Sequence, residues 1–99
     1  MTEVEITVPE YALSDAVPVA VERAFAADGL TITLNGTLAQ YPGCTHWHLK
    51  RGRERGTLEA TWHPPKRRLW FKMAAGRTGD WIEESVARMK AQIECELAG

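Results

Sequence analysis

The chain has 99 residues and a formal net charge of −1, and 44% of its residues are hydrophobic. These values are typical of one globular domain and argue against intrinsic disorder. No apolar run approaches the ~20 residues of a membrane helix, and the acidic start lacks the features of a signal peptide. Cys44 and Cys95 are too far apart in the sequence to indicate a disulfide scaffold. We therefore expect a single cytoplasmic domain over residues 1–99, without membrane association.

The first expected elements are a strand and a helix. Val4 and Ile6 alternate with polar residues, as in a half-buried strand, and whether this segment pairs with the rest of the sheet stays open. Asp15 is placed as the N-cap of the helix and Gly29 at its C-terminal end. The helix between them carries one apolar stripe, formed by Val17, Val21, Ala24 and Phe25.

Four strands and a second helix are expected after the first helix. Short turns separate the strands, which favours an antiparallel meander. The expected strands are Leu30–Gln40, Cys44–Arg51, Gly56–His63 and Arg68–Ala74. Asp80 and Glu83 resemble a capping box at the start of the last helix. Its apolar stripe is Ile82, Val86, Met89, Ile93 and Leu97. The sequence thus predicts an α+β fold of two layers, with two helices on one face of a four-stranded antiparallel meander.

The strand register is predicted from the turns, because side chains alternate between the faces of a sheet. A turn at Gly52–Arg55 pairs Leu49 with Leu58 and Trp47 with Ala60. A turn at Pro64–Arg67 pairs Trp62 with Leu69, Ala60 with Phe71 and Leu58 with Met73. A turn at Pro42 pairs Leu34 with Leu49 and Gly36 with Trp47. All three turns place the apolar residues on one face.

The opposite face is then polar. The helices are expected to cover the apolar face and to leave the polar face open to water or to a partner. The residues on it that we select as candidate ligand-binding groups are His46, His48, Glu59, Thr61, Trp70 and Lys72. Glu59 opposite Lys72 is interpreted as a cross-strand ion pair.

A metal-dependent or thiol enzyme at Cys44, His46 and His48 is an alternative. These residues project side by side from one strand, with His63 expected opposite Cys44, and imidazole, thiolate and carboxylate groups are zinc ligands. Their spacing matches no zinc signature, and nothing in the sequence indicates an oxyanion hole. We therefore assign no metal ligands and no cofactor, expect a fold that forms without metal, and favour a function that is not enzymatic, while whether the histidine row binds metal stays open.

Positive charge is concentrated in the middle of the chain. Residues 43–79 carry nine basic and two acidic residues, whereas residues 1–42 and 80–99 are both net acidic. The candidate anion-binding residues are Arg51, Arg53 and Arg55 at one hairpin tip, with Arg77 before the last helix. With Trp70 available for base stacking, they define a second alternative, a nucleic-acid-binding module. We expect its binding to be weak and confined to low salt, because both flanking segments are acidic.

The order of elements is similar to that of the double-stranded-RNA-binding domain. That family begins its last helix with a lysine-rich segment, whereas this chain has Asp80-Trp81-Ile82-Glu83-Glu84 there. The sequence therefore favours a small binding or adaptor domain that uses its polar sheet face for an unknown protein or small ligand, or pairs that face with a second copy as a homodimer.

Overall fold

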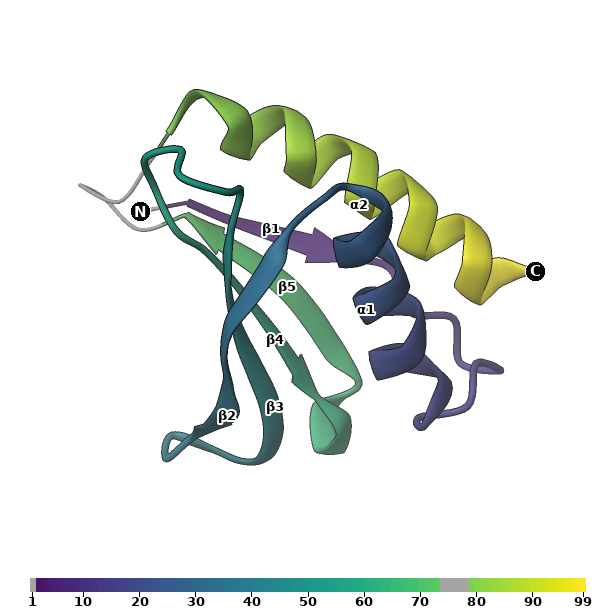
Figure 1. The fold of residues 1–99 in the computed structure, drawn as a ribbon. Helices are drawn as coiled ribbons and strands as arrows, with labels where there is room; N and C mark the ends of the chain where they lie inside the picture. The colour runs from purple at the N-terminus through teal and green to yellow at the C-terminus, as the bar shows by residue number, and fades with distance from the viewer. Residues whose placement is uncertain (1, 74–78) are drawn as a thin grey trace.

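The computed structural model describes residues 2–73 and 79–99, and within them two helices lie on an antiparallel sheet of five strands (Figure 1). The elements in chain order are β1 (Thr2–Ile6), α1 (Ala16–Ala27), β2 (Thr31–Leu38), β3 (Tyr41–Lys50), β4 (Leu58–His63), the 3₁₀ turn η1 (Pro64–Lys66), β5 (Arg68–Met73) and α2 (Asp80–Ala98). The strand order across the sheet is β1-β5-β4-β3-β2. The α+β class and the meander of β2 to β5 are confirmed.

The N-terminal segment joins the sheet as an edge strand. β1 pairs antiparallel with β5, which places Glu3 opposite Lys72 and Glu5 opposite Trp70. This pairing settles the question that the sequence leaves open and adds a fifth strand to the predicted four. No helix in the described ranges has the length and apolar character needed to cross a membrane.

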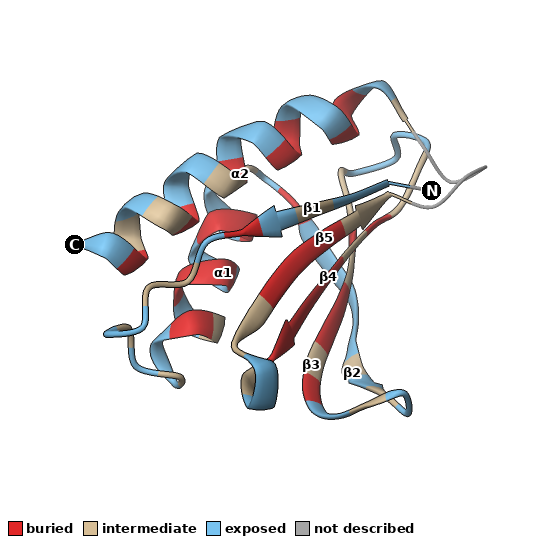
Figure 2. Cartoon of the chain, turned by 180° about the vertical axis from the view of Figure 1, so that it is seen from behind, coloured by how far each residue is buried: buried red, intermediate tan, exposed pale blue. Residues whose placement is uncertain are grey.

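Both helices pack on the same face of the sheet and bury the stripes that the sequence predicts (Figures 1 and 2). α1 follows its N-cap Asp15, and Gly29 takes a φ of 73° just beyond its end, a conformation that favours glycine. α2 has Gly79 as its N-cap, so the predicted capping box at Asp80 is wrong by one position. Asp80 and Glu83 lie instead in the first turn, where acidic side chains stabilise the helix N-terminus.

The predicted register of the three central strands is confirmed. Leu49 pairs with Leu58 and Trp47 with Ala60, and Ala60 in turn pairs with Phe71. The helix-covered face of these strands forms the core. Figure 2 shows that most residues along the middle of these strands are buried. Its largest fully buried side chains include Trp47, Trp62, Phe25, Phe71, Leu49, Leu58 and Leu69.

The predicted register of the first hairpin is wrong. Its turn is Ala39–Gln40 instead of Tyr41–Gly43, and irregularities on both sides of Leu34–Gly36 shift the pairing. Trp47 consequently lies opposite Asn35, and Gly36 lies opposite His46. The physical reason is that β2 is an edge strand with little helix cover, so burial does not determine which of its side chains face the helices. Leu34, for example, is 44% exposed.

Candidate functional site

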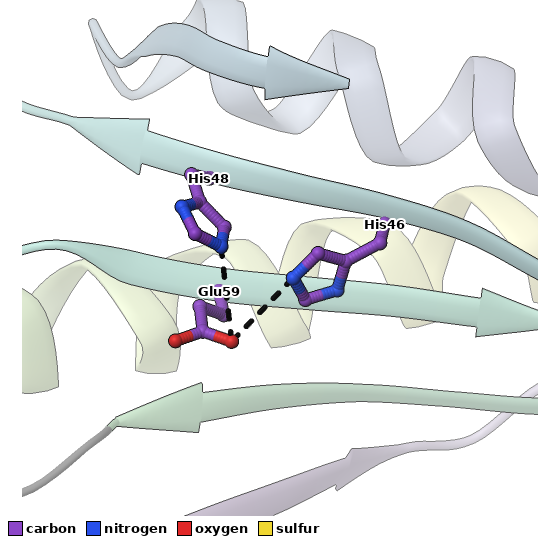
Figure 3. Close-up of side chains that lie close together, drawn as sticks. All are labelled: His46, His48 and Glu59. Carbon is purple, nitrogen blue, oxygen red and sulfur yellow. Dashed lines mark ion pairs between the residues drawn. The ribbon is translucent and has the colours of Figure 1, made fainter. Parts of the chain in front are cut away.

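The predicted ligand-binding residues meet on the sheet face that points away from the helices. Two cross-strand rows run over β3, β4 and β5. The rows are His48–Glu59–Lys72 and His46–Thr61–Trp70. We call these six residues the polar-face site. Figure 3 shows three of them projecting from β3 and β4 on the side opposite the helices.

The centre of the polar face is not open to water, which corrects the sequence-based expectation. His46, Thr61 and Trp70 are 5%, 2% and 3% exposed, although no helix covers them. Tyr41 covers part of this face, with its ring centroid 5.4 Å from that of His63 and 5.3 Å from that of Trp70. The sequence placed Tyr41 in a turn, whereas the shifted hairpin makes it the first residue of β3 and directs it over the face.

Trp70 is covered by charged side chains as well as by Tyr41. The Arg68 guanidinium lies 4.0 Å from the centroid of the Trp70 ring. Glu3 and Glu5 of β1 each accept a hydrogen bond from Arg68, chiefly the Glu5 carboxylate, and they raise the pKa of Arg68. Trp70 therefore packs against its neighbours and presents no open surface for base stacking.

A small recess remains beside these residues. It has a volume of about 40 Å³, enough for a water molecule or a small ion. Glu3 and Tyr41 line it together with most of the polar-face site, namely His46, Glu59, Thr61, Trp70 and Lys72. A larger ligand would have to displace Tyr41. The recess thus has room only for a small group.

His46, His48 and Glu59 form the tightest cluster of titratable groups in this site. The Oε1 atom of Glu59 lies 3.4 Å from His46 Nε2 and 3.9 Å from His48 Nε2, as Figure 3 shows. The His46 and His48 rings make an edge contact at 5.0 Å. Burial lowers the pKa of His46 below its ordinary value of 6.5, and the Glu59 carboxylate opposes that shift. His46 is therefore mainly neutral at pH 7.

The thiol alternative is less well supported by the geometry. Cys44 is 3% exposed, and its Sγ accepts a hydrogen bond from the Leu38 backbone N–H at 3.2 Å. The described residues contain one group of three metal-ligand side chains, and it consists of His46, His48 and Glu59. Cys44 and His63, which the sequence placed beside that group, lie outside it.

The basic hairpin tip contains one arginine with a structural role. Arg51 Nη2 donates hydrogen bonds to Asp28 Oδ2 and Ser85 Oγ, both at 2.7 Å, and its guanidinium lies over the Trp81 ring. Asp28 also accepts from Arg88 Nε at 2.7 Å. This network ties the tip to the end of α1 and to α2, so Arg51 is already paired with protein groups.

The other predicted anion-binding residues lie on the exposed part of the tip or outside the described residues. Arg53 and Arg55 are exposed, and the Arg55 carbonyl accepts a hydrogen bond from Trp81 Nε1 at 2.8 Å. Arg77 lies outside the described residues. Because Arg51 is paired and Trp70 is covered, the structure supports a nucleic-acid-binding module less than the sequence alone did. Weak binding at low salt stays a prediction.

Sequence reasoning missed Tyr41, Arg68 and Glu3 as parts of the site. The position of Glu3 at the site follows from the pairing of β1 with β5. The alternating pattern indicated a strand there but not which strand it pairs with. Tyr41 depends on the hairpin turn at Ala39–Gln40, a sequence without the usual turn residues.

In three comparisons with known proteins, no protein-family model, no curated protein and no solved structure matched this chain.

Proposed function

We propose that this protein is a small binding domain whose ligand binds at the polar-face site. The observation that carries the proposal is the burial of polar side chains on a face without helices. Among the described residues, the buried polar or charged side chains are His46, Thr61, His63 and Ser85, and the first three lie on this face.

Burial of such groups is normally unfavourable, because they lose their contacts with water. A buried imidazole with a shifted pKa, grouped with a carboxylate at a recess, is the kind of arrangement that marks functional sites. The size of the recess supports a small polar ligand, either free or as a group of a partner protein. The proposal retains a cytoplasmic location, which the unpaired cysteines Cys44 and Cys95 support.

Backbone ¹H–¹⁵N NMR spectra test this proposal. The protein would be titrated in turn with Zn²⁺, Mg²⁺, inorganic phosphate, free amino acids, nucleotides and a single-stranded oligonucleotide. We expect a small ligand to shift the amide signals of residues 46, 48, 59, 61, 70 and 72 and to leave Arg53 and Arg55 unchanged. Shifts confined to Arg53 and Arg55 on adding the oligonucleotide, or no shifts with any compound, would contradict the proposal.

Self-association stays a separate prediction. A second copy that paired through the polar face would contact the Tyr41 cover before it reached Trp70. Sedimentation velocity over a range of protein concentrations measures whether a dimer forms. A dimer that leaves the polar-face amide signals unchanged would show that pairing uses another surface.

A further inference from the structure

The donor atoms of His46, His48 and Glu59 converge on one small volume. All three lie within 4.8 Å of one another. A tetrahedral zinc ion with bonds of 2.0–2.1 Å separates its donor atoms by about 3.3 Å. The 3.4 Å between His46 Nε2 and Glu59 Oε1 matches that value, whereas the 3.9 Å between Glu59 Oε1 and His48 Nε2 is longer, so His48 must move closer to bind the same ion.

The contacts within the cluster are too long for good hydrogen bonds. An N–H···O bond normally spans 2.7–3.2 Å, whereas both imidazole–carboxylate distances exceed this range. Two imidazoles and a carboxylate oxygen thus lie close together at distances that a bridging cation would satisfy better than a hydrogen bond.

His46 is held in an orientation that suits a metal ligand. Its Nδ1 lies 2.8 Å from the Oγ1 of Thr61, the residue directly opposite it on β4. If Nδ1 carries the proton and donates to Thr61, the Nε2 lone pair points toward Glu59. Metal-ligating histidines commonly have their second nitrogen held by such a hydrogen bond. His46 is 5% exposed and Thr61 2% exposed, so surrounding atoms restrict both side chains.

The local charge also favours a cation. Three carboxylates, Glu3, Glu5 and Glu59, face two cationic side chains, Arg68 and Lys72, across these strands. Counted without the imidazoles, these five charged groups are negative by one unit. The adjoining recess has room for a water molecule or a small ligand group.

We propose that His46 Nε2, His48 Nε2 and the Glu59 carboxylate bind a divalent transition-metal ion of the Zn²⁺ type, with a fourth coordination position facing the recess. Two imidazoles and one carboxylate are a ligand set that zinc takes, with the remaining position left to water or a ligand. The proposal rests on the proposed function, because it names the ligand class of the same polar-face site. The apolar core is complete without the ion, so the metal adds to a folded domain.

Calorimetric titration of Zn²⁺ into untagged, metal-free protein tests this proposal. A Cys95→Ser background removes the exposed thiol, which would otherwise compete for zinc. We expect one Zn²⁺ to bind per chain, and either Glu59→Gln or His48→Gln to weaken the Zn²⁺ affinity more than ~10-fold. Loss of a group that only hydrogen-bonds to a ligand already costs ~10–100-fold in metal affinity, and loss of a ligand itself costs more. Mg²⁺, which prefers oxygen ligands, is expected to show no binding.

Two variants serve as matched controls. His63→Gln removes the histidine of the same face that lies outside the cluster, and it should leave Zn²⁺ affinity within about threefold, since no ligand is lost. Lys72→Gln removes a neighbouring positive charge and should strengthen binding. Circular dichroism and the melting temperature of each variant without metal verify folding.

Two results would overturn the metal proposal. Absence of Zn²⁺ binding, or binding that Glu59→Gln and His48→Gln leave unchanged while both variants are folded, excludes this cluster as a metal site. If another small compound still shifts the polar-face amides, the proposed function stands and the metal proposal alone fails. If no compound does, both fail.

Discussion

Replacing Gly79 with alanine is expected to lower the free energy of unfolding by about 2–4 kcal/mol. A Cβ at this position would lie 1.9 Å from the Arg55 carbonyl oxygen and 3.1 Å from Trp81 Nε1. The backbone of the hairpin tip must therefore move away from the start of α2. That movement breaks the 2.8 Å hydrogen bond from Trp81 Nε1 to Arg55 O. Urea unfolding followed by circular dichroism measures the loss.

Gly36→Ala is the matched control for this variant. A Cβ on Gly36 meets only the end of the Leu34 side chain, at 3.9 Å, and its backbone φ is not positive. The expected change in stability is less than about 0.5 kcal/mol. If Gly36→Ala destabilised as much as Gly79→Ala, Gly36 would face Trp47, as the sequence-based register has it, and the pairing of β2 with β3 described above would be wrong.

Replacing Asp28 with alanine is expected to lower the free energy of unfolding by about 2–3 kcal/mol. The change removes charge-assisted hydrogen bonds from Arg51 and Arg88, and it leaves the half-buried Arg51 without its carboxylate. It also removes the link from Asp28 to Arg88 of α2, while the hydrogen bond from Arg51 to the Asp28 backbone carbonyl remains. Arg53→Gln, at the exposed part of the same tip, should change stability by less than about 0.5 kcal/mol. Equal losses in the two variants would argue against the network.

The Asp28 network should also make stability depend on pH. Burial acts to raise the pKa of Asp28, but hydrogen bonds from Arg88 and Ser85 and the charges of Arg88 and Arg51 lower it below its ordinary value of 3.8. A carboxyl with a lowered pKa in the folded state stabilises the protein above its unfolded-state pKa. This contribution is lost as the pH falls from about 4 through the folded-state pKa.

Asp28→Asn is the control for the pH dependence, because it keeps the shape of the side chain and removes the titration. Melting temperatures between pH 7 and pH 2 should fall less steeply at the acidic end in this variant than in the unaltered protein. Parallel curves for the two proteins would mean that Asp28 has a similar pKa in the folded and unfolded states.

The sequence could predict those parts of the fold in which burial and turn chemistry agree. β4 lies between β3 and β5, and its apolar side chains must all reach the helix-covered face. A shift of one residue would turn them to the other face, so only one register is compatible with a core. The apolar stripes of α1 and α2 are equally constrained. These are the elements whose pairing or buried face was predicted correctly.

The sequence could not predict β2, because neither face of this edge strand is well covered. Six of its eight residues are exposed, including Ile32 and Leu34, so a shift in register has little energetic consequence there. The Pro42-Gly43 pair resembles a turn, yet both residues lie within β3, and Gly43 takes a φ of 84° at an irregular part of the ladder. The cover of Tyr41 over the polar face follows from this shift and was therefore missed.

The role of Arg51 was hidden for a different reason. Its partners Asp28 and Ser85 are 23 and 34 residues away in the sequence; Asp28 directly follows α1, and Ser85 lies on α2. A cluster of arginines at a hairpin tip indicates an anion site only if nothing else in the fold neutralises it. By contrast, the turn at Gly52–Arg55 and the alternation of side chains together placed His46, His48 and Glu59 on one face, because all three lie on central strands with a well-determined register.

Side-chain ¹H–¹⁵N NMR of the three histidines tests most directly whether the polar-face site binds a metal ion through His46 and His48. In metal-free protein at pH 7, we predict that His46 is neutral. On adding one equivalent of Zn²⁺, the Nε2 signals of His46 and His48 should shift to the metal-bound range, with the proton of His46 on Nδ1, while His63 stays unchanged. Unchanged His46 and His48 signals, or a shift confined to His63, would contradict the assignment of this cluster as a metal site.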